Sequence, residues 1–111
     1  MHVAGTNGKG SVTLKVAKSL SNLGFKTGMF ISPHVNTFRE RIQIDNEYID
    51  KESVVEKCHR IFEMVEKHKL QLRYFEVLTM LALLEYKEKK CQYAVLECGI
   101  GGHLDSTNIV D

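Results

Sequence analysis

The sequence predicts an α/β domain in which a mostly parallel sheet lies between helices, giving three layers. Short apolar runs typical of strands alternate along the 111 residues with longer segments of helical period. Residues 93–96 are apolar throughout, as in a central parallel strand that is covered on both faces. Because crossovers between parallel strands are right-handed, we expect helices on both faces of the sheet.

The first third of the chain is expected to hold a strand, a helix and a second strand. Residues 3–4 could end a buried strand. Residues 11–23 repeat apolar side chains at helical spacing and are followed by Gly24, a typical helix stop. Residues 27–31 have the composition of a short strand, which the Ser-Pro-His of 32–34 interrupts.

The middle of the chain predicts a small hairpin and then a helix. Residues 41–44 alternate polar and apolar side chains, 45–46 form a turn, and 47–49 resume the strand pattern. Asp50 is a suitable N-cap for a helix that ends near 68–69. The apolar face of this helix is expected to comprise Val54, Val55, Cys58, Ile61, Phe62 and Val65.

The last third predicts a buried helix, a central strand and a second glycine-rich loop. Residues 74–86 are apolar on nearly all sides, and the charged stretch 87–90 is expected to be a solvated last turn. Strand 93–96 leads into the loop 97–102. The three unusual loops of the chain therefore all follow predicted strands, and at the carboxyl edge of a parallel sheet they should converge, where ligands gather.

Composition restricts the classes of function. The formal net charge is +1, with 15 basic and 14 acidic residues, which argues against a dedicated nucleic-acid or membrane surface. No apolar run is long enough to span a bilayer, and the first residues show no secretory signal. The three cysteines form no CxxC pair, so we expect reduced thiols and a cytoplasmic protein, with a mitochondrial form left open.

The segment Gly5-Thr6-Asn7-Gly8-Lys9-Gly10-Ser11 has the context of a phosphate-binding loop, between a predicted strand and a predicted helix. Glycines allow backbone N–H groups to approach phosphate oxygens, and the helix N-terminus adds partial positive charge. Lys9 would reach the β- and γ-phosphates, and the Ser11 hydroxyl could face Mg²⁺. In the standard pattern Ser or Thr follows Lys directly, whereas here Gly10 intervenes. The alternative is an ordinary glycine-rich turn with an exposed lysine.

Two oxygen-bearing side chains at strand ends are candidate metal ligands. Glu97 stands where the central strand ends, opposite the glycine-rich loop, and Mg²⁺ prefers oxygen ligands. Ser32 follows the second strand and could supply another oxygen. The alternatives are a solvated carboxylate for Glu97 and a turn cap for Ser32.

Four ordered motifs resemble a known family. The loop 5–11 resembles the ATP loop of the Mur ligase superfamily, which carries the inserted glycine. Residues 32–34 with 39–42 (Arg-Glu-Arg-Ile), residues 75–79 (Phe-Glu-Val-Leu-Thr) and the block 97–108 resemble folylpolyglutamate synthases and dihydrofolate synthases. The predicted fold is accordingly a domain similar to the P-loop NTPases.

The resemblance implies an ATP-dependent ligase that phosphorylates a folate or dihydropteroate carboxylate and joins it to the amine of L-glutamate, with ATP and Mg²⁺ as cofactors. Lys9 would be catalytic, and Ser32 and Glu97 would hold the metal. The implied ATP contacts are Thr6, Asn7, Gly8, Lys9, Gly10 and Ser11. The implied substrate contacts are His34, Phe75, Glu76 and Asp105.

The resemblance implies a protein much longer than the 111 residues of this sequence. We therefore expect residues 1–111 to be a partial ATP-binding domain, incomplete at both ends, without the glutamate-binding C-terminal domain and poorly active alone. The complete protein is expected to be a monomer. Two other interpretations remain open, namely another Mur-type amino-acid ligase and a nucleotide-binding module without ligase activity.

Overall fold

The structure is a computed structural model that describes residues 2–3, 9–32 and 36–97, with side chains from residue 10 onwards. Five strands form one sheet in the order β1-β5-β2-β3-β4. In chain order they are β1 His2–Val3, β2 Thr27–Phe30, β3 Ile42–Ile44, β4 Glu47–Tyr48 and β5 Tyr93–Glu97. The helices are α1 Lys9–Asn22, the 3₁₀ turn η1 Phe38–Arg41, α2 Lys51–His68 and α3 Tyr74–Glu88.

The sheet is mixed, so the expectation of a mostly parallel sheet is wrong, whereas the α/β class is confirmed. β1, β5 and β2 run parallel, while β2–β3 and β3–β4 are antiparallel pairs. The reason is the short connection from β2 to β3, whose described residues, 31–32 and 36–41, include η1 but no crossover helix that a parallel pairing would need. β5 lies between two parallel neighbours, as the apolar run predicts.

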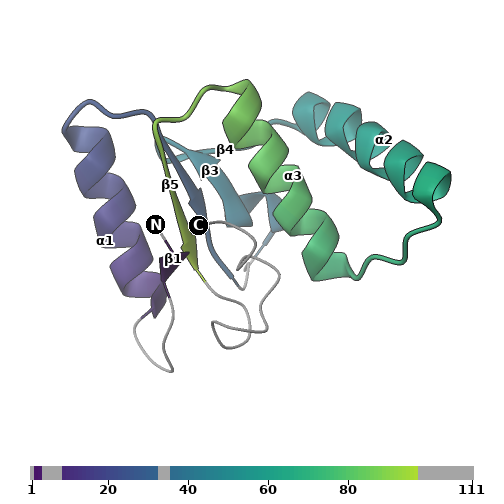
Figure 1. The fold of residues 1–111 in the computed structure, drawn as a ribbon. Coiled ribbons are helices and arrows are strands. Elements are labelled where there is room, and N and C mark those ends of the chain that lie inside the picture. The colour runs from purple at the N-terminus through teal and green to yellow at the C-terminus, as the bar shows by residue number, and fades with distance from the viewer. Residues whose placement is uncertain (1, 4–8, 33–35, 98–111) are drawn as a thin grey trace.

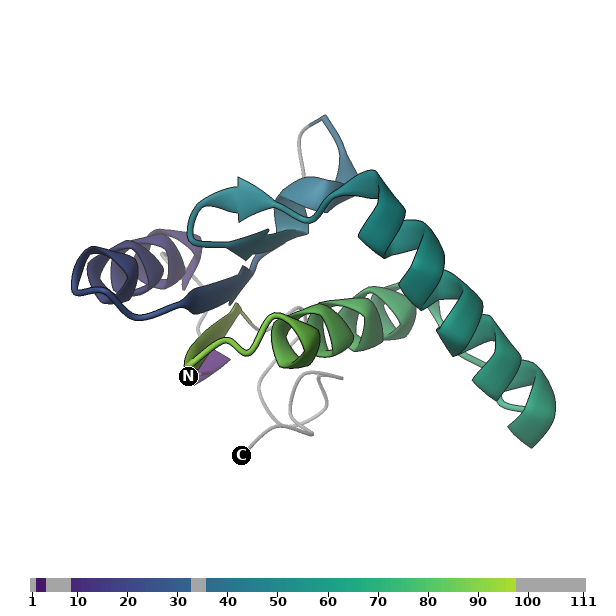
Figure 2. The ribbon, with the colours of Figure 1, turned by 90° about the horizontal axis from the view of Figure 1, so that it is seen from above.

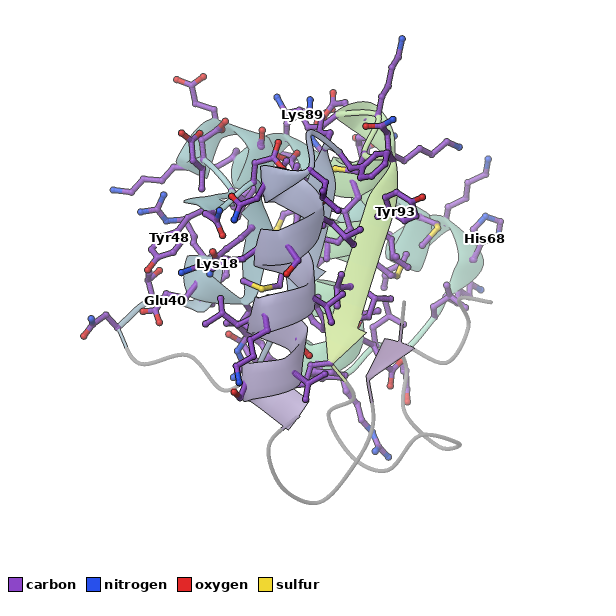
Figure 3. All side chains as sticks on the ribbon, turned by 90° about the vertical axis from the view of Figure 1, so that its left-hand side faces the viewer. Lys18, Glu40, Tyr48, His68, Lys89 and Tyr93 are labelled. Carbon is purple, nitrogen blue, oxygen red and sulfur yellow. The ribbon has the colours of Figure 1, made fainter. Side chains whose placement is uncertain are left out.

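Helices cover both faces of the sheet (Figure 1). On one face α1 buries Ala17 against Met29 and Val95. On the other face α3 packs on Phe30 and Leu96, and α2 lies against α3 and extends away from the sheet (Figure 2). Figure 3 views the molecule from the α1 side, with α1 in front of the sheet and β5 beside it.

Local signals place the element ends as expected. Gly24, at φ +95°, ends α1, and the Phe25 N–H donates to the Leu20 carbonyl at 3.1 Å, as in a Schellman motif. The hairpin turn has positive φ at both Asp45 and Asn46, which matches a type I′ turn. Asp50 caps α2 by accepting the Ser53 N–H at 2.7 Å, so this predicted N-cap is confirmed.

The predicted apolar face of α2 is wrong in part. Val55 is 59% exposed and Phe62 is 56% exposed, whereas Lys57 is buried. The Lys57 ammonium lies 3.0 Å from Glu85 Oε1 of α3 and is also paired with Glu88. Burial alone would lower the pKa of Lys57, but hydrogen bonds from the ammonium to Glu88 and Glu85 outweigh it and raise this pKa to about 12.

The start of α3 also departs from the expectation that this helix is buried on nearly all sides. The middle and end of the helix are buried, but Tyr74 in the first turn is 60% exposed. Its ring lies 5.9 Å from the guanidinium carbon of Arg41.

Among the described residues, no helix combines the length and apolarity that crossing a membrane requires.

Candidate functional site

The three parallel strands end together at one edge of the sheet. Val3 of β1 pairs with Glu97 of β5, and Phe30 of β2 pairs with Leu96, so the strand ends are level to within a residue. α1 and α3 both begin at this edge (Figure 1). The expected convergence is therefore confirmed for the described ends of the strands, and two helix N-termini lie beside them.

Glu97 and Gly10 are brought together at this edge. The Glu97 side chain is only 2% exposed, and a Cβ placed on Gly10 would lie 3.5 Å from Glu97 Oε2. Alternation along β5 explains the direction, because Val95 faces α1 and Glu97 follows two residues later. The glycine that separates Lys9 from Ser11 therefore lies beside the carboxylate predicted to hold a metal.

Lys9 and Ser11 belong to the first turn of α1, as a phosphate-binding loop requires. The Ser11 side chain is exposed, so its hydroxyl is accessible. The partial positive charge at the start of α1 favours anionic oxygens there, whether from a carboxylate or from a phosphate. A backbone N–H group near Gly10 could donate to a phosphate because no side chain shields it.

Ser32 lies just beyond the end of β2, the strand next to β5, and is half-buried. The preceding Ile31 N–H donates to the Arg41 carbonyl at 3.0 Å, which fixes the exit of β2. The described residues hold no group of three His, Cys, Asp or Glu side chains suited to a metal. Glu97 and Ser32 each offer an oxygen at the end of one of two neighbouring strands, which is the type of donor that Mg²⁺ prefers, and this ion commonly takes its remaining ligands from phosphates and water.

Phe75 and Glu76 lie in the first turn of α3, at the same edge of the sheet. Both side chains are half-buried. The Phe75 ring packs against Phe30 with centroids 5.6 Å apart, so Phe75 contributes to the core as well as to this edge.

Five predicted site residues lie outside the described residues, and the Lys9 side chain does as well. The five are Thr6, Asn7, Gly8, His34 and Asp105. The structure therefore brings together Gly10 and Glu97, places Ser32 one strand away, and places Phe75 and Glu76 at the start of α3.

Sequence reasoning missed a capping box in η1. The Thr37 side chain accepts the Arg39 N–H, and the Glu40 side chain accepts the N–H of Thr37. Its sequence signature is a Thr followed three residues later by a Glu, which is present here and could have revealed it.

The fold and this edge define an α/β segment in which a glycine at a helix N-terminus lies beside a buried strand-end carboxylate. No family model matches the chain. The dihydrofolate synthase/folylpolyglutamate synthase of Buchnera aphidicola is 38% identical over 113 aligned residues, which cover 98% of this chain and 26% of that protein. The resemblance to folylpolyglutamate synthases is thereby confirmed at the level of sequence.

Solved structures give the same result for the fold. The folylpolyglutamate synthase of Thermotoga maritima matches with a TM-score of 0.91 and 45% identity, over 99% of this chain and 27% of that one. A structure described as an FPGS–AMPPCP–folate complex matches with a TM-score of 0.89 and 35% identity, over 98% of this chain and 28% of that one. The chain thus spans about a quarter of the length of these relatives.

Proposed function

We propose that this chain is part of an ATP-dependent ligase that adds L-glutamate to the carboxylate of a folate or a dihydropteroate. The observation that carries the proposal is the placement of Gly10, at the start of α1, beside the buried carboxylate of Glu97. A strand-end carboxylate facing a helix N-terminus suits a nucleotide with its bound cation. The similarity to a protein solved with AMPPCP and folate supports the same assignment.

The nucleotide half of the site would be formed by the loop 5–11 with Glu97 and Ser32. Residues Thr6 to Ser11 would surround the phosphates, with the Lys9 ammonium beside the transferred phosphoryl group, where it offsets developing negative charge. Glu97 and Ser32 would hold Mg²⁺. When bound, Mg²⁺ would neutralise charge on the phosphate oxygens.

The acceptor half of the site would lie at the start of α3. Phe75 and Glu76 would face the folate, together with His34 and Asp105. The folate carboxylate would attack the γ-phosphorus of ATP, giving an acyl phosphate and ADP, and the glutamate amine would then displace phosphate. A free carboxylate is a poor acyl donor, and phosphorylation supplies the leaving group.

The wider architecture follows from the same proposal. The described sheet and helices would form part of a three-layer domain of the P-loop type, and glutamate would bind on a second domain. The complete enzyme would act as a monomer in the cytoplasm or the mitochondrion.

The test is ADP release by the full-length protein that carries this sequence, with labelled glutamate and either dihydropteroate or tetrahydrofolate. We expect release that depends on both glutamate and one of the acceptors, with label entering the product. Lys9→Ala should reduce turnover by about a hundredfold or more. Lys18→Ala is the matched control, because Lys18 lies on the same helix and is exposed (Figure 3).

The outcomes separate the candidate functions. Glutamate incorporation with either acceptor supports the ligase and identifies the step. Lys9-dependent nucleotide binding without turnover on either acceptor would contradict folate ligation and favour another Mur-type ligase or a binding module. Equal nucleotide binding by Lys9→Ala and the parent would overturn the phosphate-loop assignment itself.

A further inference from the structure

We propose that Glu40 is a positioning residue for the nucleotide half of the site, acting through Ser32. The inference rests on the proposed function, because it concerns how one of the proposed metal ligands is held. Glu40 itself lies on η1, on a flank of the molecule, and Figure 3 shows it on the same flank as Tyr48 and opposite His68.

The Glu40 carboxylate binds the backbone of the segment that leads into η1. Its Oε1 atom accepts the N–H of Asn36 at 2.7 Å and the N–H of Thr37 at 2.9 Å. The Thr37 hydroxyl in turn accepts the Arg39 N–H at 3.4 Å. Hydrogen bonds from neutral N–H groups to a carboxylate are about twice as strong as those between neutral partners. This carboxylate therefore fixes the backbone at Asn36.

The backbone just after β2 is held by Arg41, the residue that follows Glu40. The Ile31 N–H donates to the Arg41 carbonyl at 3.0 Å. The backbone is thus held at Ile31 and again at Asn36, and Ser32 directly follows the first of these points. Loss of the second attachment would widen the range of positions open to Ser32.

The 3₁₀ turn can serve as an anchor because it is itself bonded to the sheet and to the residue that follows β4. The Gln43 side-chain amide donates to the Glu40 carbonyl at 2.7 Å. The Arg39 guanidinium donates to the Ile49 carbonyl at 3.3 Å. The carboxylate of Glu40 therefore ties the backbone at Asn36 and Thr37 to the sheet through η1.

Partners that hydrogen-bond directly to metal ligands typically change metal affinity or activity by about 10- to 100-fold when they are removed, and Glu40 acts one step further away, so the lower end of this range applies. We therefore expect Glu40→Ala to weaken binding of Mg–AMPPCP by about tenfold. Glu40→Gln keeps a carbonyl oxygen in place of Oε1 and should restore affinity to within about threefold of the parent, since neutral hydrogen bonds are weaker than charged ones.

The experiment is a double-mutant cycle between Ser32→Ala and Glu40→Ala in the full-length protein, with Mg–AMPPCP affinity measured by titration calorimetry. If Glu40 acts through Ser32, adding Glu40→Ala to Ser32→Ala should weaken binding further by less than about twofold. Amide hydrogen exchange at Asn36 and Thr37 should accelerate in Glu40→Ala and remain slow in Glu40→Gln. Should Glu40→Ala not fold, Glu40→Asp replaces it, because its shorter side chain cannot reach both N–H groups.

Asp50→Ala is the matched control. Asp50 also caps a helix through a carboxylate and a backbone N–H, but the helix is α2 and Ser32 is not attached to it. The Asp50→Ala variant should reduce the free energy of unfolding and leave Mg–AMPPCP affinity unchanged. Equal affinity of Glu40→Ala and the parent, or additive effects with Ser32→Ala, would overturn the positioning inference alone. A parent protein that does not bind Mg–AMPPCP would instead overturn the proposed function.

Discussion

Replacing Gly10 by alanine should raise stability and weaken nucleotide binding at the same time. Gly10 lies in the first turn of α1, where its φ is not in the left-handed region. The added Cβ would lie 3.5 Å from Glu97 Oε2, which is ordinary van der Waals contact. The substitution therefore introduces no clash in the free protein.

The two effects have opposite signs for separate physical reasons. Alanine is favoured over glycine in a helix interior by about 1 kcal/mol, and we expect about 0.5 kcal/mol of added stability in the first turn. The methyl group would cover one side of the Glu97 carboxylate and keep phosphate oxygens from approaching the Gly10 backbone. A loss of about tenfold in Mg–AMPPCP affinity, or about 1.4 kcal/mol, is expected.

Thermal unfolding and calorimetric titration of the same preparations measure both quantities. Gly24→Ala is the control, because Gly24 has φ +95° and no atom within 4 Å of an added Cβ. It should lower stability by about 1 kcal/mol through backbone strain and leave affinity unchanged. If Gly10→Ala bound Mg–AMPPCP as tightly as the parent, the place of Gly10 in the phosphate site would be refuted.

Three further predictions concern the fold that supports the site. Gly28→Ala places a Cβ 2.6 Å from the Tyr86 ring and should cost about 1–3 kcal/mol in urea unfolding, and Tyr86→Leu in the same background should recover part of it. Lys57→Met leaves the buried Glu85 carboxylate without its cation and should cost about 3–5 kcal/mol, whereas the double variant with Glu85→Leu should regain most of this. A backbone hydrogen bond from Ser53 at the start of α2 holds the pKa of Asp50 below its ordinary 3.8. The stability that the Asp50 carboxylate contributes is therefore fully present above pH 3.8 and is lost as the pH falls through the pKa of the folded state. Asp50→Ala should lack this acid-side loss in a pH series of melting temperatures, and an unchanged pH profile would contradict the assignment.

The sequence predicted the helix ends, the helix cap and the hairpin turn, because each of these features is determined by a few adjacent residues. Gly24 ends α1, Asp50 caps α2, and the turn at 45–46 closes a hairpin. The position of Glu97 at the end of a buried strand was predictable in the same way. The capping box of η1 was equally local, and its Thr-x-x-Glu pattern was present in the sequence.

The face of α2 could not be predicted from its own periodicity. Hydrophobic spacing alone selects Val55 and Phe62, which are exposed, and rejects Lys57, which is buried. Burial of a lysine requires anionic partners, and its partner Glu85 lies on another helix. Which side of α2 faces α3 therefore depends on a pairing between residues far apart in the sequence.

The direction of the Glu97 side chain is a consequence of core packing on both faces of β5. Val95 is buried against α1, Leu96 is buried against α3, and Glu97 returns to the α1 side beside Gly10. A shift of one residue in the pairing of β5 would move all three side chains to the opposite faces. The apolar residues that specify the register of the central strand thereby also specify which helix N-terminus the Glu97 carboxylate faces. The direction of this side chain is therefore determined by the hydrophobic pattern of β5, although no single residue adjacent to Glu97 in the sequence predicts it.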